Sequence, residues 1–400
     1  MWGQTLKHRY EMTCVTKFVT VLVVLALIPC AFPNSSLAKR KRRGLRTRAL
    51  KQRAAQFPKR RWRPHRCRAG TRPAGAVPPD GFARWCVKEF SGDFLKHGAY
   101  RGWYANGRKQ LFGQYRQGDK SGLWFEWYDN GNPKSLTRYI DGQRHGLQRT
   151  WHVNGKLASA VRVVRDKREG VMQVWHPDGT LAKRVTYIAG QRHGQLMAWH
   201  SNGKVHRRGA FEADKRSGDW EILFEDGSPA FRGQYRQGKE HGDFVVWTGP
   251  NERDWSGHFQ DGEKHGGFTT WHTNGQKESV VQWRFGKVVG VSRTWNKVGQ
   301  LVREARYAAG QLHGLERGWH ANGKLKQRTS WHEGRKQGLS ETWDAAGVRR
   351  TRSKWRAGKL FGRFFVWSKT GKFQAGSCYV ADKESWSTPH EPEAQIRACP

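Results

Sequence analysis

Histidines recur at two fixed positions of a 24-residue repeat, and imidazole nitrogens are common metal ligands. One set follows a tryptophan and the other precedes a glycine. The first set is His152, His176, His200, His272 and His320, and the second is His97, His145, His193, His241, His265 and His313. If each repeat supplies two strands, equivalent positions lie about 9–10 Å apart, whereas zinc ligands lie about 2.1 Å from the metal. The spacing therefore favours hydrogen bonds in turns and between strands over a row of metal sites.

Four cysteines flank the repeats, with Cys67 and Cys86 before them and Cys378 and Cys399 after them. They form no Cys-x-x-Cys pair of the kind that zinc sites use. In an exported protein an even number of cysteines indicates disulfides, and four cysteines allow three connectivities. We expect Cys67–Cys86 and Cys378–Cys399, each closing a local loop at an open end of the array, because sheet edges and terminal repeats need capping.

Sequence signatures of catalysis are missing from the chain. It contains no Gly-x-Ser-x-Gly, no P-loop, no His-Glu-x-x-His and no glycine pattern of a dinucleotide site. Acidic residues such as Glu126, Glu221, Glu225 and Glu341 are scattered along the chain. We therefore predict a protein that is not an enzyme and needs no metal or cofactor.

The elements that position these side chains are tandem repeats, because glycine recurs every 24 residues from Gly98 to Gly362. A tryptophan lies five residues after each of these glycines, except at Leu223. The repeat-defining glycines include Gly98, Gly122, Gly146, Gly170, Gly194, Gly266, Gly314 and Gly338, and their tryptophans are Trp103, Trp127, Trp151, Trp175, Trp199, Trp271, Trp319 and Trp343. Repeats of this kind contact their neighbours and usually form a long binding surface.

Each repeat has the pattern of a β-hairpin. A second glycine, often in Asn-Gly or Asp-Gly, lies nine residues after the first, and another aromatic residue usually lies at seventeen. Asn-Gly predicts a type I′ turn between strands such as Leu147 to His152 and Lys156 to Arg162. The remaining glycines, as in Asp141-Gly142 and His145-Gly146, are expected in the second bend. We predict an all-β fold of tandem 24-residue β-hairpin repeats in one elongated antiparallel sheet; a β-solenoid with one coil per repeat is the alternative.

The repeat unit, for example GLQRTWHVNGKLASAVRVVRDKREG from Gly146 to Gly170, closely resembles the MORN-repeat variant. Such repeats occur in bacterial proteins grouped as YwqK-type antitoxin-like, and the resemblance covers about twelve repeats in residues 92–377. It implies antiparallel hairpins laid side by side and no catalytic residues. Departures from the unit at Asp214, Leu223 and residues 248–251 predict local irregularity in the middle of the array.

The first 38 residues have the pattern of a signal peptide. An apolar stretch from Phe18 to Phe32 follows Lys7, Arg9 and Lys17 and precedes small residues that end at Ala38. The stretch is short for a membrane span and contains Pro29. We expect cleavage after Ala38, with Met12 as a possible true start, and hence an exported protein (periplasmic, cell-envelope or secreted) with no integral membrane span. An uncleaved anchor and lipidation at Cys30 are the alternatives.

A basic arm follows at residues 39–66, which we expect to be disordered because it holds many cations and no Asp or Glu. A loop-like cap at 67–91, the array at 92–377 and a tail or cap at 378–400 complete the predicted organisation. The formal net charge of the whole chain is +40. An exported chain of this charge is expected to meet anionic surfaces.

These features predict an exported, non-enzymatic scaffold whose sheet binds an unknown macromolecule, either a protein or an anionic envelope polymer or lipid headgroups. Basic, tryptophan-rich surfaces also bind nucleic acid, but the aromatic residues are needed for packing, and anionic surfaces are favoured over a dedicated nucleic-acid site. An antitoxin-like or immunity protein that masks a partner toxin is the alternative function. A spacer with no saturable partner is the third.

Overall fold

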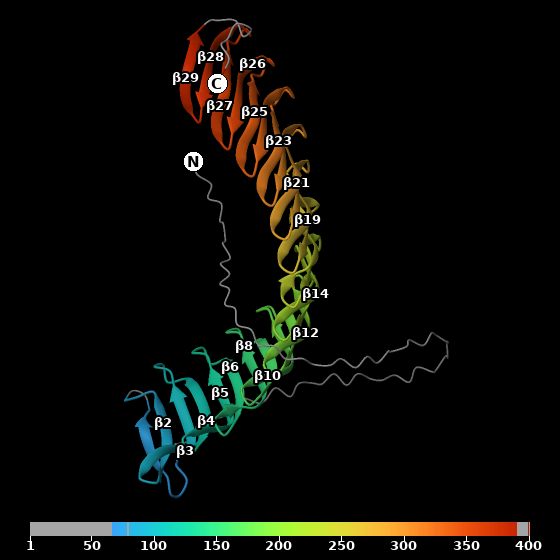
Figure 1. The fold of residues 1–400 in the computed structure, drawn as a ribbon. Coiled ribbons are helices and arrows are strands. Elements are labelled where there is room, and N and C mark those ends of the chain that lie inside the picture. Colours follow the sequence, from blue (N-terminus) through green and yellow to red (C-terminus); the bar gives the residue numbers. More distant parts are fainter. Residues whose placement is uncertain (1–65, 78–79, 390–398, 400) are drawn as a thin grey trace, which may run out of the picture. The chain divides into compact units, whose positions relative to one another are not determined.

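A computed structural model describes residues 66–77, 80–389 and 399, and these form one antiparallel sheet of 29 strands (Figure 1). The chain divides into the units Met1–Gln56 and Phe57–Pro400, and all described residues belong to the second. The predicted signal peptide and nearly all of the basic arm lie outside the described residues. Within the described part no residue is helical, and no helix is long and apolar enough to cross a membrane.

The strands of the first half are β1 (Arg72–Ala76), β2 (Ala83–Phe90), β3 (Asp93–Trp103), β4 (Lys109–Arg116), β5 (Asp119–Trp127), β6 (Pro133–Ile140), β7 (Gln143–Arg144), β8 (Gly146–Trp151), β9 (Leu157–Val164), β10 (Lys167–Trp175), β11 (Leu181–Ile188), β12 (Gln191–Trp199), β13 (Val205–Glu212), β14 (Lys215–Leu223) and β15 (Pro229–Arg236). Those of the second half are β16 (Lys239–Glu240), β17 (Gly242–Gly249), β18 (Glu252–Gln260), β19 (Glu263–Trp271), β20 (Lys277–Arg284), β21 (Lys287–Trp295), β22 (Leu301–Ala308), β23 (Gln311–Trp319), β24 (Leu325–His332), β25 (Arg335–Trp343), β26 (Arg349–Arg356), β27 (Lys359–Trp367), β28 (Phe373–Val380) and β29 (Lys383–Pro389).

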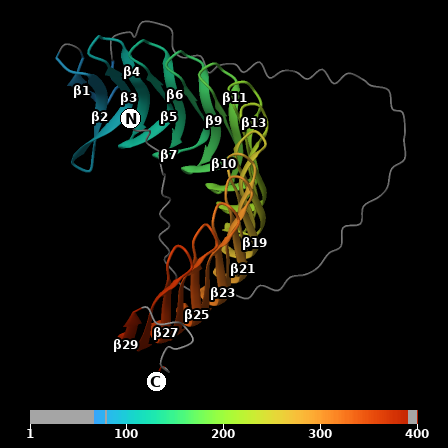
Figure 2. The same ribbon diagram turned by 90° about the horizontal axis from the view of Figure 1, so that it is seen from above.

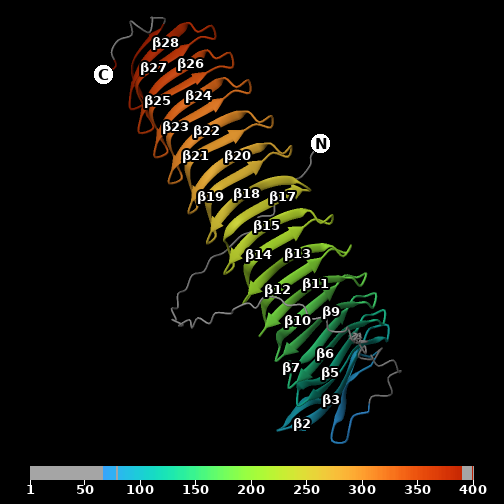
Figure 3. The ribbon, with the colours of Figure 1, turned by 90° about the vertical axis from the view of Figure 1, so that its right-hand side faces the viewer.

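Each strand pairs antiparallel with the next one in the chain, so the hairpins follow one another along the sheet (Figures 2 and 3). The short strands β7 and β16 interrupt two of the hairpins, where β6 pairs with β8 and β15 with β17. The predicted sheet of antiparallel hairpins is confirmed, and the alternative of a β-solenoid is wrong. Two-residue and three-residue turns favour this outcome because they reverse the chain completely.

The prediction of a type I′ turn at Asn-Gly is wrong. In the loop from His152 to Lys156 only Gly155 has a positive φ, of 83°, and Asn154 does not. The Gly155 N–H donates to the His152 carbonyl at 2.9 Å, and the His152 N–H donates to the Lys156 carbonyl at 2.8 Å. This is a type I turn followed by a left-handed glycine, the usual three-residue hairpin loop. Asn154 stabilises this loop through its side chain, because its Oδ1 accepts a hydrogen bond from the Lys156 N–H at 3.0 Å.

Type I′ turns occur instead at the opposite edge of the sheet. Both central residues have positive φ there, as in Asp141 (46°) with Gly142 (77°) and Arg165 (46°) with Asp166 (65°). These turns also contact the preceding repeat, since the Gly142 N–H donates to the Lys120 carbonyl at 3.0 Å. We call the edge of Asn-Gly loops the loop edge and the edge of type I′ turns the turn edge.

The glycine that defines the repeat lies inside a strand rather than in the second bend. Gly170, with φ of 73°, is in β10, where residues 170–172 lie opposite Val161 alone and form a β-bulge. On the other side Gly170 pairs directly with Tyr187, seventeen residues on. The same pairing joins Gly194 to Phe211 and Gly314 to Trp331. The periodic glycine therefore permits a bulge, and the periodic aromatic residue lies across from it.

Only one of the three departures from the repeat changes the backbone. Leu223 pairs with Pro229 just as Trp199 pairs with Val205, and Asp214 is the second residue of a regular type I′ turn. At residues 248–251 the strands instead extend to Gly249 and Glu252, and Pro250 and Asn251 make a two-residue turn. The predicted irregularity is therefore confined to this loop.

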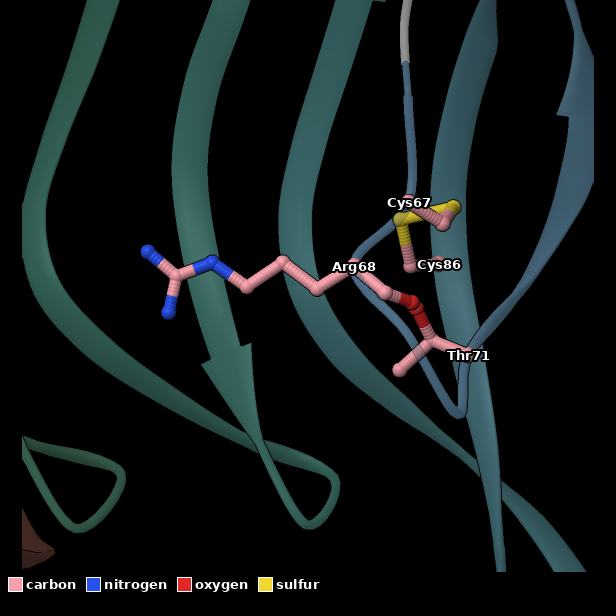
Figure 4. The surroundings of a disulfide bond; sticks show 4 residues. All are labelled: Cys67, Arg68, Thr71 and Cys86. Atoms are coloured by element: carbon pink, nitrogen blue, oxygen red, sulfur yellow. A yellow bond between two sulfur atoms is a disulfide. The ribbon is translucent and has the colours of Figure 1, made fainter.

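The expected loop-like character of the cap at 67–91 is wrong, because β1 and β2 lie within this segment and continue the sheet, whereas its role as a cap stays a prediction. The segment Ala83–Phe90 is rich in strand-forming residues and pairs with β3. The structure joins Cys67 to Cys86 and Cys378 to Cys399, the pairs expected from the sequence. Figure 4 shows this disulfide between Cys67 and Cys86 together with Arg68 and Thr71. Cys86 belongs to β2, and the Thr71 hydroxyl donates to the Arg68 carbonyl at 2.6 Å.

Alternation along the strands gives the sheet two faces. On one, which we call the core face, a continuous hydrophobic cluster is buried, made of Val185, Tyr187, Leu196, Phe211, Trp220, Tyr235 and Phe244. Four glycines of this face, Gly113, Gly209, Gly233 and Gly257, make room for the rings of Trp124, Trp220, Phe244 and Phe268 in the next repeat, and none has a positive φ. At these four positions glycine is required because a larger side chain would overlap the neighbouring ring, and not because of its backbone conformation.

Candidate interaction surface

The opposite face, which we call the ladder face, carries the periodic tryptophans. Trp127 and Trp367 are buried, and the other periodic tryptophans are half-buried. Their rings pack against neighbours of the same face, as in Phe125 with Trp127 at 6.0 Å between centroids. Cations from the preceding repeat cover several of them, with Arg232 5.8 Å from the Trp247 ring and Arg349 5.5 Å from the Trp367 ring. The tryptophans thus link repeats and still present part of each ring to solvent.

The histidines that follow the tryptophans link neighbouring loops along the loop edge. The His152 Nε2 donates to the Trp175 carbonyl at 2.9 Å, and His176, His200, His272 and His320 contact the carbonyl 23 residues on at 2.9–3.0 Å. In the described residues no group of three His, Cys, Asp or Glu side chains is placed to hold a metal ion. The expected hydrogen-bonding role of this set is confirmed.

Asparagine and lysine add to the same links. Asn154 Nδ2 donates to the Pro177 carbonyl at 2.7 Å, and Lys156 Nζ donates to the Asp178 carbonyl at 2.6 Å. Asn322 repeats the arrangement, with Nδ2 2.7 Å from the Ala345 carbonyl and Oδ1 3.1 Å from the Lys324 N–H. Each loop is therefore held both internally and to the next repeat.

We expect Asn322→Ala to destabilise the two repeats it joins by about 1 kcal/mol, since two hydrogen bonds are lost from an exposed loop. The next loop naturally has Ala346 at the equivalent position, so Ala346→Asn should stabilise the array by a similar or smaller amount. Urea unfolding of the two variants measures both effects. Shifts of the same sign would contradict the assigned role of the asparagine.

Across the middle of the ladder face runs a continuous row of directly opposed residues, one from each strand between β2 and β28 except the short β7 and β16. We call it the central row. It reads Arg84, Arg101, Phe112, Phe125, Leu136, Arg149, Ala160, Gln173, Arg184, Met197, Arg208, Glu221, Arg232, Val245, Ser256, Thr269, Val280, Arg293, Glu304, Arg317, Arg328, Glu341, Arg352, Phe365 and Gly376. Arginine is its commonest member, so the row has a net positive charge, with uncharged stretches of which the longest runs from Val245 to Val280.

Carboxylates in the row are surrounded by arginines. Glu341, whose side chain is 2% exposed, is bound by Arg328 and lies 3.7 Å from Arg349 and 3.8 Å from Arg352. Glu304 accepts from Arg293 at 2.9 Å and from Arg317 at 3.3 Å. Because each carboxylate has two or three guanidinium partners, the clusters keep a net positive charge. A buried carboxylate in such a cluster fixes the orientation of its arginines.

A hollow of about 720 Å³ opens on the ladder face around Glu221, between β12 and β17. Glu221 is held by Arg208 at 2.6 Å and Arg232 at 2.9 Å. Both oxygens of its carboxylate are therefore engaged by guanidinium groups. Leu223 replaces the periodic tryptophan of this repeat.

The sequence analysis missed the central row, although it named Glu221 and Glu341 as scattered acids. The row combines positions three and fourteen residues after the repeat glycine, and these positions vary between arginine, glutamate and apolar residues. Only the register of the hairpins shows that they are neighbours. A search for opposite charges at these two offsets is the signal that could have found it.

Cations also cover the rings of the core face. Arg216 lies 4.9 Å from the Trp220 ring and 5.0 Å from the Tyr235 ring, and its NH1 donates to the Tyr235 hydroxyl at 2.8 Å. Burial raises the pKa of Tyr235, although the Arg216 charge opposes this shift. Lys120 and Lys264 occupy equivalent positions over Trp124 and Trp283. These cations serve packing, since each is placed over a buried or half-buried ring.

At the first repeats three cations meet without a carboxylate in the row. Burial lowers the pKa of Arg101, and burial together with the Arg101 charge lowers the pKa of Lys109. Arg84 pairs directly with Arg101 in the register of β2 and β3. Arg101 and Lys109 are thus partly buried cations that lie close enough for the Arg101 charge to act on Lys109.

Charge is distributed in three blocks along the described sheet. Residues 66–211 contain 26 Lys and Arg against 10 Asp and Glu, and residues 264–389 contain 24 against 8. Residues 212–263 between them contain 6 against 12. The array therefore has two cationic ends and an acidic centre.

Three segments match the model of the MORN repeat variant family, at residues 120–141, 168–189 and 312–333. Each match begins two residues before a repeat glycine, at Gly122, Gly170 and Gly314, so the three share one phase. No curated protein matches the chain.

Among solved structures, the crystal structure of TcdB2-TccC3 without its hypervariable C-terminal region is 12% identical, with a TM-score of 0.16, and the match covers 74% of this chain and 16% of that one. The crystal structure of TcdB2-TccC3-Cdc42 is 9% identical, with a TM-score of 0.10, over 74% of this chain and 23% of that one. The chain thus spans less than a quarter of either structure's chain.

Proposed function

We propose that this MORN-variant repeat protein is an exported, non-enzymatic scaffold that binds an extended anionic macromolecule of the cell envelope along its ladder face. The observation that carries the proposal is the central row, which is unbroken from β2 to β28 and mostly cationic where it is charged. A binding surface that repeats with the hairpin suits a polymer better than a small molecule. The pattern of a signal peptide supports export.

The arrangement of charges supports a binding role over catalysis. The carboxylates that lie closest to the large hollow and to the arginine clusters are each ion-paired with two or three arginines, so their oxygens are already engaged within the protein. A single sheet also provides less enclosure than the clefts that catalysis normally uses. The protein is therefore expected to bind its partner without changing it.

The experiment that tests the proposal is a pull-down with the mature protein from envelope and secreted fractions at two salt concentrations. Retention of an acidic polymer at low salt, lost at high salt, is the expected result, because salt screens exposed charges. Equal capture of neutral polymers, or no saturable capture at all, would contradict it. The second outcome would favour a spacer.

Deletion of residues 39–63 is expected to weaken binding to anionic surfaces and to flatten its salt dependence, since the segment is rich in Lys and Arg and contains no Asp or Glu. The measurement is the affinity of the full mature chain and of the deletion variant for anionic vesicles or polymer at several salt concentrations. If both proteins bind equally at low salt, the arm has no electrostatic role.

The acidic centre at residues 212–263 favours one alternative, an antitoxin-like or immunity role in which the sheet masks a basic partner toxin. Such a role needs a saturable one-to-one complex. A toxin encoded beside this chain that copurifies with it would support this alternative, and its absence from the complex would favour the scaffold.

A further inference from the structure

Two arginines of the central row face each other in the C-terminal cationic end. Arg317 in β23 and Arg328 in β24 are direct partners in the register. Like charges in directly opposed positions destabilise a sheet. Such a pair therefore requires compensation from the residues around it, and an anion that lies between the two guanidinium groups would add to that compensation.

Carboxylates on the outer sides hold the two side chains without covering them. Arg317 NH1 lies 3.3 Å from Glu304 Oε1, and Arg328 is bound by Glu341. The side chains of Arg317 and Arg328 remain 46% and 44% exposed. Since a guanidinium has five N–H donors in a fixed fork, each arginine is oriented by its glutamate and can still donate to a ligand.

An aromatic ring lies beside the pair on the same face. Trp319 is half-buried and follows Arg317 by two residues in β23, so both side chains are on the ladder face. Further cations lie on this face in the neighbouring repeats, with Arg306 in β22 and Lys354 in β26, both exposed. Arg306 and Lys354 are each two strands away from Arg328, on opposite sides of it, which is about 9–10 Å across the sheet. The surface thus offers one strong anion position with weaker ones roughly a repeat away on each side.

We propose that the pair Arg317–Arg328 binds a uronate carboxylate of an acidic polysaccharide, and that the sugar ring lies against Trp319. This proposal rests on the proposed function, because it names the polymer that the scaffold binds. The carboxylate accepts from both guanidinium forks, the geometry for which arginine is best suited. The apolar face of the sugar ring covers the exposed part of the indole.

The row itself favours a polysaccharide over a nucleic acid. Glu304 and Glu341 lie on either side of the arginine pair, so the excess positive charge of the row is spaced along it and matches a polymer with a charge on every unit, such as a nucleic acid, less well. A polysaccharide with a uronate at every second sugar can place its charges at the arginines and its neutral sugars past the glutamates. The other arginine pair, Arg84 with Arg101, has Gly75 and Phe112 rather than glutamates beside it in the register, so no carboxylate of the row orients its guanidinium groups.

The test compares two double variants of the mature full-length protein. Arg317→Gln with Arg328→Gln removes the proposed site, whereas Arg208→Gln with Arg232→Gln removes two arginines that are also paired with a buried glutamate but have Leu223 in place of the tryptophan. The probe is an oligosaccharide with a uronate at every second sugar, measured by calorimetry at constant salt. We expect about a tenfold loss of affinity for the first variant and less than about threefold for the second.

Urea unfolding of both variants separates binding from folding, and Arg317→Lys with Arg328→Lys keeps the charge while it removes the forks, so it should bind with intermediate affinity. Equal losses in the two double variants, or tighter binding of single-stranded DNA with the same sensitivity to the arginine pair, would overturn the proposal. If the wild-type protein binds no anionic polymer at all, the proposed function fails. Binding that is insensitive to Arg317 and Arg328 overturns only the site.

Discussion

Gly233→Val is expected to destabilise the middle of the sheet by about 1–3 kcal/mol or more, which is the usual result of overpacking a core. A Cβ atom at Gly233 would overlap the ring of Phe244 and come within 2.9 Å of Phe231 Cζ. Phe244 is 2% exposed and packs against Phe259 at 4.9 Å between centroids, so its ring has little room to move. Urea unfolding followed by tryptophan fluorescence measures the loss.

A compensating change in the next repeat tests whether space is the cause. Val185 and Leu196 occupy the same two positions elsewhere in the array and are direct partners in the register. The double variant Gly233→Val with Phe244→Leu copies this pair and should recover much of the lost stability, although Phe244→Leu alone costs about 1 kcal/mol. If the double variant instead loses the sum of the stabilities lost by the two single variants, Gly233 is needed for its backbone conformation and not for the space it leaves.

Removal of the Cys67–Cys86 disulfide, as Cys67→Ala with Cys86→Ala, is expected to cost about 3 kcal/mol locally, because a closed loop of this size restricts the unfolded chain by about that amount. Cys86 is 2% exposed and pairs with Pro73 in β1, so the edge strand should loosen first. Hydrogen exchange in β1 to β4 should accelerate, while the C-terminal strands keep their protection.

The matched control is Cys378→Ala with Cys399→Ala, which opens a bond with a sequence separation of 21 residues at the other end. Its effect should be confined to β27 to β29, since repeats are stabilised mainly by their nearest neighbours. Loss of protection over the whole array in either variant would mean that the sheet unfolds as one cooperative unit. If neither variant loses protection from hydrogen exchange, the two disulfides are not needed to cap the sheet.

The fold could be predicted from the sequence because its period is long and regular. The sequence has a glycine every 24 residues, a tryptophan five residues later and Asn-Gly loops. The open question was whether each repeat forms a hairpin of two strands or one coil of a solenoid. The type of turn predicted at Asn-Gly was wrong because a left-handed glycine occurs both in a type I′ turn and in the bulge that follows a type I turn. The non-glycine pairs Arg165 with Asp166 and Ala213 with Asp214, which form type I′ turns, carry no obvious sequence signal.

The proposed binding surface was less predictable, because its residues become neighbours only through the register of the strands. Arg328 and Glu341 are thirteen residues apart and lie in different repeats, yet they are direct partners. A bulge at Gly338 shifts the register by two residues, so Arg328 lies opposite Glu341 rather than Leu339. Alternation along the chain therefore places these residues on one face, but it does not show which of them are partners.

The most direct test of the account is calorimetry with uronate oligosaccharides of increasing length against the mature protein. If the ladder face binds a polymer along its repeats, affinity should rise with each unit that reaches a further repeat, because added contacts act at high effective concentration. An affinity that stops rising after the first one or two sugars would show a single small site instead. That result would contradict the binding of a macromolecule along the sheet.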